Sequence, residues 1–385
     1  MPMLRQLRPS GVERRASARP PVILVTGGAG YIGAVLVGQL LTRGYRVRVL
    51  DRFLYGAAPL QAWREHPELT CITADLRDSQ VLARAVAGVA AVIHLGALVG
   101  DQACALEPTI TVAINHTATA ELARACRDAG VGRLLFASTC SVYGASDTVL
   151  DEQSPLRALS LYAESKISAE QAVLSQRTPD FSPIVLRFAT AYGAAPRPRF
   201  DLVINLLAAQ ALTERHVTIF GGDQWRPFIH VEDIVRALVQ ALEAPPTVTA
   251  GQIFNVGSDG ENYRLAAIGE LIGELVPGTH IDTVDDVTDP RNYRVSFAKI
   301  RSRLHFRARH SIRSSFPTLR ALIVERIAGQ YQAPAYHNAR WLAQQSPIWH
   351  RATIAAPHPR HALSFVPSVP GESEQQPNGL AATNR

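Results

Sequence analysis

The chain has 385 residues, of which 47% are hydrophobic and 19% are charged. This length exceeds one ordinary domain, and the composition is that of a globular chain with a large core, so collagen-like and wholly disordered chains are excluded. The formal net charge is +6, but residues 1–20 carry +4, residues 301–330 carry +6 and residues 331–385 carry +2, which leaves −6 for residues 21–300. The acidic body does not favour nucleic-acid binding.

The first 20 residues contain five arginines but no apolar stretch, so they predict a disordered basic segment and not a secretory signal. Residues 21–42 carry no charge, yet Thr26 and the glycines after it interrupt the run, which favours a strand, a turn and a helix over a membrane span. The four cysteines show no CxxC spacing and no zinc-ligand pattern. We therefore expect no metal, no membrane contact and a cytoplasmic protein with reduced thiols.

From residue 22 onwards, short β-branched apolar runs alternate with longer helical patterns. The expected strands are 22–26, 45–50, 69–73, 90–95, 133–138 and 183–188, and the expected helices lie near 31–43, 78–87, 108–129 and 160–177. Strict alternation of this kind predicts an α/β fold, a Rossmann-type doubly wound parallel sheet. We expect this domain to span residues 21–192.

Beyond residue 193 the alternation weakens. Residues 193–330 are expected to form a smaller C-terminal substrate-binding lobe, in which AAPRPRF (194–200) is an irregular connection. Residues 331–385 show no sustained period and predict a disordered tail. Trp341 and Trp349 are eight residues apart, so a short docking helix is the alternative for part of this tail.

A glycine-rich loop follows the first expected strand. TGGAGYIG contains G-x-G-x-x-G as Gly28, Gly30 and Gly33, and G-x-x-G-x-x-G as Gly27, Gly30 and Gly33. Glycines at this spacing let the backbone turn tightly and approach a pyrophosphate, whose charge meets the amide end of the next helix. The loop therefore predicts a dinucleotide site.

Asp51 ends the second expected strand, 18 residues after Gly33. A carboxylate there accepts hydrogen bonds from the adenosine ribose and repels a 2′-phosphate, which favours NAD. The neighbouring Arg52 is the competing feature, because a guanidinium could accommodate the 2′-phosphate of NADP. Asp75, in TADLRD, is either an acceptor for the adenine amino group or a turn and capping residue.

These and later motifs resemble the extended short-chain dehydrogenase/reductases, in particular their nucleotide-sugar epimerase and dehydratase branch, over roughly residues 20–325. The motifs are TGGAGYIG, TADLRD, HLGAL (94–98), FASTCSVYG (136–144), YAESK (162–166), RFATAYG (187–193), GGDQWRPFIHVEDI (221–234) and FNVGS (254–258). Gly96 replaces an alanine of the family pattern, and Asn115 fits its mid-helix asparagine, although Ala118 stands where a glycine is usual. The resemblance implies that the cofactor-binding residues are Gly27, Gly28, Gly30, Tyr31, Ile32, Gly33, Asp51, Arg52, Asp75, Leu76, Leu95 and Ala97, together with Tyr162 and Lys166.

The same resemblance makes Thr139, Tyr162 and Lys166 the catalytic residues. Tyr162 and Lys166 are four residues apart and share one helical face. We expect the ammonium to lower the phenol pKa, so that Tyr162 takes a proton from a sugar hydroxyl. Thr139 would hold the same oxygen. Lys166 is one of only two lysines in the chain, which makes a chance match less probable.

On the substrate side, the resemblance places a nucleotide-diphosphate sugar against Thr190, Asn205, Arg226 and Arg291. A bidentate guanidinium suits a pyrophosphate. For Arg226 the alternative is a structural salt bridge to Glu232 or Asp233, and Thr190 stands where many relatives have asparagine. His230 is expected to be a packed structural histidine.

Cys140 and Ser141 follow Thr139, where hexose 4,6-dehydratases carry an acid pair. We therefore expect an NAD-dependent nucleotide-diphosphate-sugar 4-epimerase, with Cys140 as a packing residue rather than an acid. A 4-ketoreductase is the alternative, a dehydratase is less favoured, and a cofactor-binding regulatory protein is the non-enzymatic alternative. The resemblance also suggests a homodimer through the helices near 108–129 and 160–177.

Overall fold

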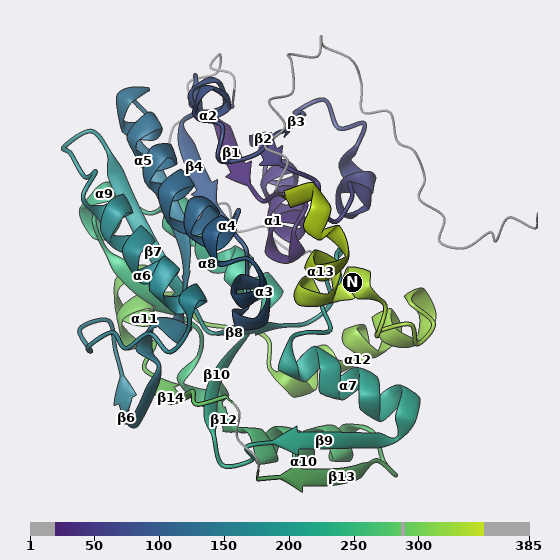
Figure 1. Cartoon of the computed structure of the whole chain (residues 1–385). Coiled ribbons are helices and arrows are strands. Elements are labelled where there is room, and N and C mark those ends of the chain that lie inside the picture. Colours follow the sequence, from purple (N-terminus) through teal and green to yellow (C-terminus); the bar gives the residue numbers. More distant parts are fainter. Residues whose placement is uncertain (1–19, 286–288, 350–385) are drawn as a thin grey trace, which may run out of the picture. The chain divides into compact units, whose positions relative to one another are not determined.

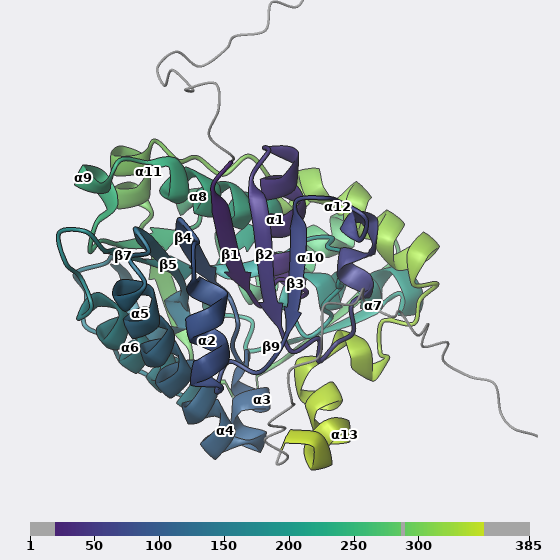
Figure 2. The ribbon, with the colours of Figure 1, turned by 90° about the horizontal axis from the view of Figure 1, so that it is seen from above.

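The computed structural model describes residues 20–285 and 289–349. Its centre is a seven-stranded parallel sheet with helices on both faces (Figures 1 and 2). The strand order is β11-β7-β5-β4-β1-β2-β3. The strands are β1 (Val22–Thr26), β2 (Arg46–Asp51), β3 (Leu69–Thr73), β4 (Ala91–His94), β5 (Arg133–Thr139), β7 (Ser182–Phe188) and β11 (Ile253–Val256).

The predicted Rossmann-type sheet is confirmed, and the six expected strands match the observed ones to within one residue at each end. The inner strands β4 and β7 are buried on both faces, with all seven residues of β7 buried, whereas the edge strand β3 has no fully buried residue. The order reverses direction between β1 and β4, and ligands bind such sheets at the carboxyl ends of the strands beside this switch point. The seventh strand, β11, was not among the expected strands.

Two helical layers cover the sheet (Figure 2). One face is covered by α2 (Ser79–Val86), α5 (Thr119–Asp128) and α6 (Leu161–Leu174), and the other by α1 (Tyr31–Thr42) and α8 (Val231–Glu243). The expected helix 108–129 is divided into α4 (Pro108–Val112), a π-helical turn (Ala113–Ala118) and α5. The π-helical turn contains Asn115, whose side-chain amide bonds both the N–H and the C=O of Leu98 at 2.8 and 2.9 Å. This residue therefore fixes the loop after β4.

A smaller lobe lies beside the carboxyl ends of the strands (Figure 1). Its core packs α7 (Val203–Glu214), α10 (Leu265–Leu275) and α12 (Ile312–Ala321) around residues such as Phe200, Ile268 and Phe316. Across both parts of the described chain, the remaining strands and α-helices are α3 (Asp101–Leu106), β6 (Ala145–Leu150), β8 (Thr190–Tyr192), β9 (His216–Phe220), β10 (Trp225–His230), α9 (Pro246–Thr249), β12 (Asn262–Arg264), β13 (His280–Val284), β14 (Asn292–Val295), α11 (Ala298–Leu304) and α13 (Asn338–Trp349).

The boundary predicted at residue 193 does not separate the two parts along the chain. After the lobe begins, α8 returns to cover the sheet, β11 pairs with β7, and Phe297 and Ile300 join the sheet's core. The prediction of one continuous lobe over 193–330 is wrong in this respect. Sequence alternation could not show it, because a strand that joins the edge of a sheet late in the chain has no local signature.

The start of the predicted disordered tail is also wrong. Residues 331–349 include a 3-10 turn (Pro334–Tyr336) and α13. Leu342 is buried in an apolar cluster, and the Trp341 indole Nε1–H donates to the Leu54 carbonyl at 3.0 Å. A few side chains hold this segment to the body, and it has no continuous apolar helix face. The alternative of a short docking helix is therefore correct. Residues 350–385 and the basic segment 1–19 lie outside the described residues.

Candidate active site

A cleft of about 1040 Å³ lies where the sheet meets the lobe. It is lined by most of the sequence-predicted site residues, namely Thr139, Tyr162, Lys166, Gly27, Gly30, Tyr31, Ile32, Gly33, Asp51, Arg52, Asp75, Leu76, Leu95, Ala97, Thr190, Arg226 and Arg291. Two predicted residues, Gly28 and Asn205, are not in its wall. The structure thus brings the three catalytic candidates and the other predicted cofactor-binding and substrate-binding residues into one cavity.

The glycine loop between β1 and α1 is packed too tightly for side chains. Gly27 has φ +71°, and a Cβ there would lie 2.8 Å from the backbone nitrogen of Gly96. A Cβ on Gly33 would lie 2.1 Å from the Gly27 carbonyl oxygen, and one on Gly28 would meet the Val49 side chain at 2.7 Å. Gly28 therefore packs the loop onto β2 and does not face the cleft. No acidic side chain and no capping side chain occupies the N-terminus of α1, so its amides suit a phosphate.

Asp51 is fixed by the backbone at the end of β2. Its carboxylate accepts from the Ala29 N–H at 2.9 Å and from the Phe53 N–H at 2.7 Å. Burial raises its pKa, and these two hydrogen bonds oppose the rise. Arg52 is ion-paired with Asp75 at 3.3 Å, and Asp75 also pairs with Arg77 at 2.7 Å. The Arg52 charge at this end of the cleft is therefore offset by Asp75, whereas the Asp51 carboxylate has no such cationic partner within 4 Å among the described residues.

The catalytic candidates converge from α6 and β5. Ser160 caps α6 by accepting from the Ala163 N–H at 3.2 Å, and Tyr162 and Lys166 follow one turn apart. Lys166 is buried, and its ammonium donates to the Ala137 carbonyl at 2.9 Å. Thr139 ends β5, and its hydroxyl donates to the Ser141 hydroxyl at 3.1 Å. All three side chains therefore come from rigid elements.

The pKa shifts correct one expectation. Burial raises the pKa of the Tyr162 phenol, and the charge of Lys166 is not among the main causes that act on it. Burial also lowers the pKa of Lys166 to about 8. The prediction that Lys166 lowers the phenol pKa is therefore not borne out by this geometry. The ammonium is held by a backbone carbonyl and lies 6.0 Å from the centre of the Tyr162 ring, so desolvation dominates.

A buried ion pair that was not predicted from the sequence anchors α6 to the sheet. Glu170 lies four residues after Lys166 on the same helix, and Arg187 Nη2 of β7 meets its Oε2 at 2.6 Å. Ser138 also donates to Glu170, and Arg187 donates to the Tyr143 hydroxyl at 3.0 Å. Both side chains of the pair are at most 3% exposed. The signal available in the sequence was an arginine within the apolar run PIVLRF.

Arg226 and Arg291, predicted to bind the substrate, both lie in the wall of the cleft. Arg226 Nη2 lies 3.1 Å from the Asp289 carboxylate, and Arg291 pairs with Asp289 at 2.5 Å and with Asp101 at 2.9 Å. Although burial opposes it, the two arginines lower the pKa of Asp289 to about 2. The alternative of a salt bridge from Arg226 to Glu232 or Asp233 is wrong.

Asn205 has a different role from the predicted one. It is buried, its Oδ1 accepts from the Gly193 N–H at 2.9 Å, and its Nδ2 donates to the Arg199 carbonyl at 2.9 Å. Its amide is thus used to hold the 193–199 connection against α7. The prediction that it contacts substrate is corrected to this positioning role.

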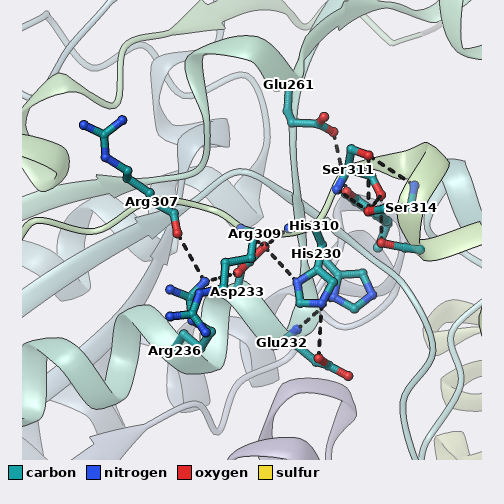
Figure 3. Close-up of polar contacts among 12 residues, drawn as sticks. His230, Glu232, Asp233, Arg236, Glu261, Arg307, Arg309, His310, Ser311 and Ser314 are labelled. Atoms are coloured by element: carbon teal, nitrogen blue, oxygen red, sulfur yellow. Dashed lines mark hydrogen bonds and ion pairs between the residues drawn. The ribbon is translucent and has the colours of Figure 1, made fainter. Parts of the chain in front are cut away.

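Figure 3 shows how the start of α8 holds the segment before α12. The Asp233 carboxylate accepts from the backbone N–H groups of Arg309 and His310, each at 2.9 Å, and pairs with Arg236. His230 stacks on His310 with ring centres 4.4 Å apart, and burial lowers its pKa to about 4. His230 is therefore a neutral, packed histidine, as predicted, and it does not line the cleft.

The cleft also contains residues that were not predicted, among them Tyr55, Arg197 and Asn338. The Arg197 guanidinium lies 3.4 Å from the centre of the Tyr55 ring, and its Nη2 donates to Asn338 Oδ1 at 2.7 Å. From the sequence, the segment around Arg197 is expected to be an irregular connection, and Asn338 is expected to lie in a disordered tail. The repeated arginines of RPRF were the available signal.

The chain matches the model of the NAD dependent epimerase/dehydratase family over residues 23–257. It belongs to this family. Membership confirms the predicted resemblance, the enzyme class and the NAD cofactor. In addition, no helix within the described ranges 20–285 and 289–349 is long and apolar enough to cross a membrane.

Relatives in this family act on nucleotide sugars in more than one way. The chain is 31% identical over 283 residues to the UDP-glucose 4-epimerase of Bacillus subtilis, covering 66% of this chain and 83% of the relative. Its structure is similar to that of UDP-glucuronic acid 4-epimerase from Bacillus cereus, solved with UDP-glucuronic acid and NAD, with a TM-score of 0.69 and 25% identity over 78% of this chain and 99% of that one. It is also similar to the dTDP-glucose 4,6-dehydratase of Streptomyces venezuelae, solved with NAD, with a TM-score of 0.71 and 28% identity over 79% and 98%.

Proposed function

We propose that the protein is an NAD-dependent nucleotide-diphosphate-sugar 4-epimerase. The observation that carries this proposal is the state of the acidic side chains around the cleft. Within residues 20–285 and 289–349, five carboxylates line it, Asp51, Asp75, Asp101, Asp201 and Asp289. Each is bound by protein donors: backbone amides hold Asp51, arginines hold Asp75, Asp201 and Asp289, and Asp101 binds Ser160 and Arg291.

This arrangement supports epimerisation over dehydration. Loss of water from a hexose needs an acid and a base beside the sugar in addition to the catalytic tyrosine. Cys140 and Ser141 occupy the two positions after Thr139, and the Cys140 thiol donates to the Arg187 carbonyl at 3.3 Å. Burial raises the pKa of this thiol, so it is a packing residue and not an acid at neutral pH.

The cofactor pocket fits NAD. The glycine loop has no room for side chains beside the amide end of α1, and Asp51 stands at the ribose side. Gly27, Gly30 and Gly33 would hold the pyrophosphate, and Leu76, Leu95 and Ala97 line the same cleft. When bound, NAD supplies the acceptor and donor of the C4 hydride.

The chain's own residues move the proton and hold the sugar. Tyr162 takes the proton of the 4-hydroxyl and returns it to the 4-keto oxygen. Thr139, at the end of β5, binds the same oxygen and stabilises the charge that develops on it. The Lys166 ammonium supplies positive charge one turn away. Arg226 and Arg291 bind the diphosphate, so the 4-keto sugar can turn about this linkage and expose its opposite face.

The test is conversion of nucleotide sugars without added reductant. We expect one member of a panel of UDP- and dTDP-linked hexoses, hexuronates and pentoses to yield its 4-epimer, detected by NMR, with no lasting absorbance of reduced nicotinamide. A parallel reaction offers a 4-keto-6-deoxy sugar with reduced cofactor. Stoichiometric cofactor consumption there, with no epimer from any sugar in the panel, would replace the proposal by the 4-ketoreductase alternative.

A homodimer through α4, α5 and α6 is part of this proposal. Leu106, Val112 and Leu159 lie on or beside these helices and are 42–51% exposed. Exposed apolar side chains of this size suit an interface between two copies. Light scattering on the purified protein should give twice the chain mass of 41.8 kDa, and a mass of one chain would reject the dimer.

A further inference from the structure

The helix α13 joins two loops that flank the cleft. On one side, Trp341 Nε1–H donates to the carbonyl of Leu54 at 3.0 Å in the loop after β2, and its ring lies 6.2 Å from that of Tyr55. On the other side, Asn338 Nδ2–H donates to the carbonyl of Val99 at 3.0 Å in the loop after β4. Because β2 and β4 flank β1 in the sheet, α13 bridges the mouth of the dinucleotide site.

Asn338 also links this helix to the lobe. Its backbone N–H donates to Asp201 Oδ2 at 3.1 Å, and its Oδ1 accepts from Arg197 Nη2 at 2.7 Å. Leu342, one turn further on, is buried in an apolar cluster with Leu98 and Ile114. These contacts place one end of α13 at a junction of three parts of the cleft wall.

Arg197 is the unusual charge of this junction. It is 6% exposed and stacks on the Tyr55 ring. Within the described part of the chain, no carboxylate forms an ion pair with it, and its Nε–H is buried without an acceptor. The neighbouring Arg199, in contrast, pairs with Asp201 at 2.9 Å. The charges of Asp201 and Asp51 act on Arg197 only without direct contact. A buried guanidinium that no carboxylate contacts directly is costly, which points to an anionic ligand beside it.

We propose that Arg197, positioned by Asn338 of α13, binds a phosphate of the dinucleotide, and that α13 retains the cofactor by closing the two loops around it. Arg197 stacks on the loop that follows Asp51, so it lies on the dinucleotide side of the cleft. The positive charge of Arg197 also lowers the pKa of Asp51, which places the two charges near each other. The diphosphate of the sugar has its own arginines, Arg226 and Arg291.

The inference uses the NAD site and not the reaction at the sugar, so its test measures cofactor release instead of turnover. Full-length protein is loaded with radiolabelled NAD, and the release rate is followed after addition of excess unlabelled NAD. Calorimetry with UDP on the same preparations measures the substrate side. Thermal unfolding checks that each variant is folded.

We expect Arg197→Gln to release NAD about 10- to 100-fold faster, because one charge-assisted interaction is lost, and to bind UDP with unchanged affinity. Asn338→Ala should also accelerate release, by about 5-fold, since Arg197 keeps its charge but loses its support. Arg313→Gln is the matched control, because Arg313 pairs with Glu274 at the surface and should leave release unchanged.

Unchanged NAD release in a folded Arg197→Gln protein would overturn the proposal. A loss of UDP affinity with unchanged NAD release would also overturn it, because Arg197 would then belong to the substrate diphosphate. Should Arg197→Gln fail to fold, Arg197→Lys keeps the charge but lacks the Nε donor and is still expected to release NAD faster. Failure to find a 4-epimer in the sugar panel would leave this result unaffected.

Discussion

Two buried arginines show how differently the two sides of the cleft are built. Arg187, under the helix α6 that carries the catalytic candidates Tyr162 and Lys166, meets Glu170 at 2.6 Å, and despite its burial the pKa of its guanidinium is raised. Arg197, beside α13, has no such carboxylate among the described residues, and burial lowers its pKa to about 10. The first charge is balanced within the chain and stabilises the fold. The second charge is proposed to bind a ligand. On this account the α6 side of the cleft is a structural support, and the α13 side is a binding surface.

The largest effect is expected on the α6 side, at the reacting group itself. Tyr162→Phe should lower kcat by about 10²- to 10⁴-fold, because the oxygen that carries the proton is removed. NAD content and thermal stability should stay unchanged. Tyr45→Phe, which removes a surface hydroxyl bonded to Glu243, is the control. Near-normal turnover by Tyr162→Phe would exclude Tyr162 from the reaction.

The buried pair under α6 tests the first half of the comparison. Glu170→Gln leaves Arg187 without its anion and should reduce the free energy of unfolding by about 3–5 kcal/mol. The matched change at a surface pair is Glu243→Gln, whose partner Arg43 is 44% exposed, and it should cost about 0–1 kcal/mol. Denaturant titrations measure both. Equal losses of unfolding free energy in the two variants would contradict the claim that the buried Glu170–Arg187 pair stabilises the fold.

The ribose side of the cleft offers a finer test of ligand charge. We expect at least about tenfold tighter binding of NAD than of NADP, equal to about 1.4 kcal/mol, because Asp51 repels a 2′-phosphate. Asp51→Asn should reduce this preference. Arg52→Gln should change it little, since Arg52 is paired with Asp75. Calorimetry that shows NADP binding as tightly as NAD to the unmodified protein would mean that Arg52, and not Asp51, determines the cofactor preference.

The smallest effect is a pH dependence. Burial lowers the pKa of Lys166 to about 8, so its positive charge is present below this pH and is lost as the pH rises through it. We therefore expect kcat to fall above pH 8. Lys166→Arg, which keeps its charge to about pH 12, should show no such fall, whatever its absolute rate. A flat profile for the unmodified protein above pH 9 would show that the Lys166 charge is not needed.

The sheet, and the meeting of the three catalytic candidates in one cleft, could be predicted from the sequence because both depend on local patterns. The β-branched runs and the glycine loop are short contiguous stretches of sequence. Thr139, Tyr162 and Lys166 lie within motifs that follow one another along the chain in the family's order. The sequence could not predict contacts between distant segments. Arg197 meets Tyr55 and Asn338 only after folding, and α13 is held by a few anchors, such as Leu342, instead of a continuous apolar face. Asn205 was misplaced for the same reason, since its partners Gly193 and Arg199 take its amide away from the cleft.

The central claim is that one retained cofactor returns the same hydrogen to the same sugar. The most direct measurement uses the sugar that the panel identifies, deuterated at C4, with purified protein and no added cofactor. The account predicts that the 4-epimer keeps deuterium at C4, as measured by NMR and mass spectrometry. A product that has lost the label, or one that forms only when reduced cofactor is supplied, would contradict it.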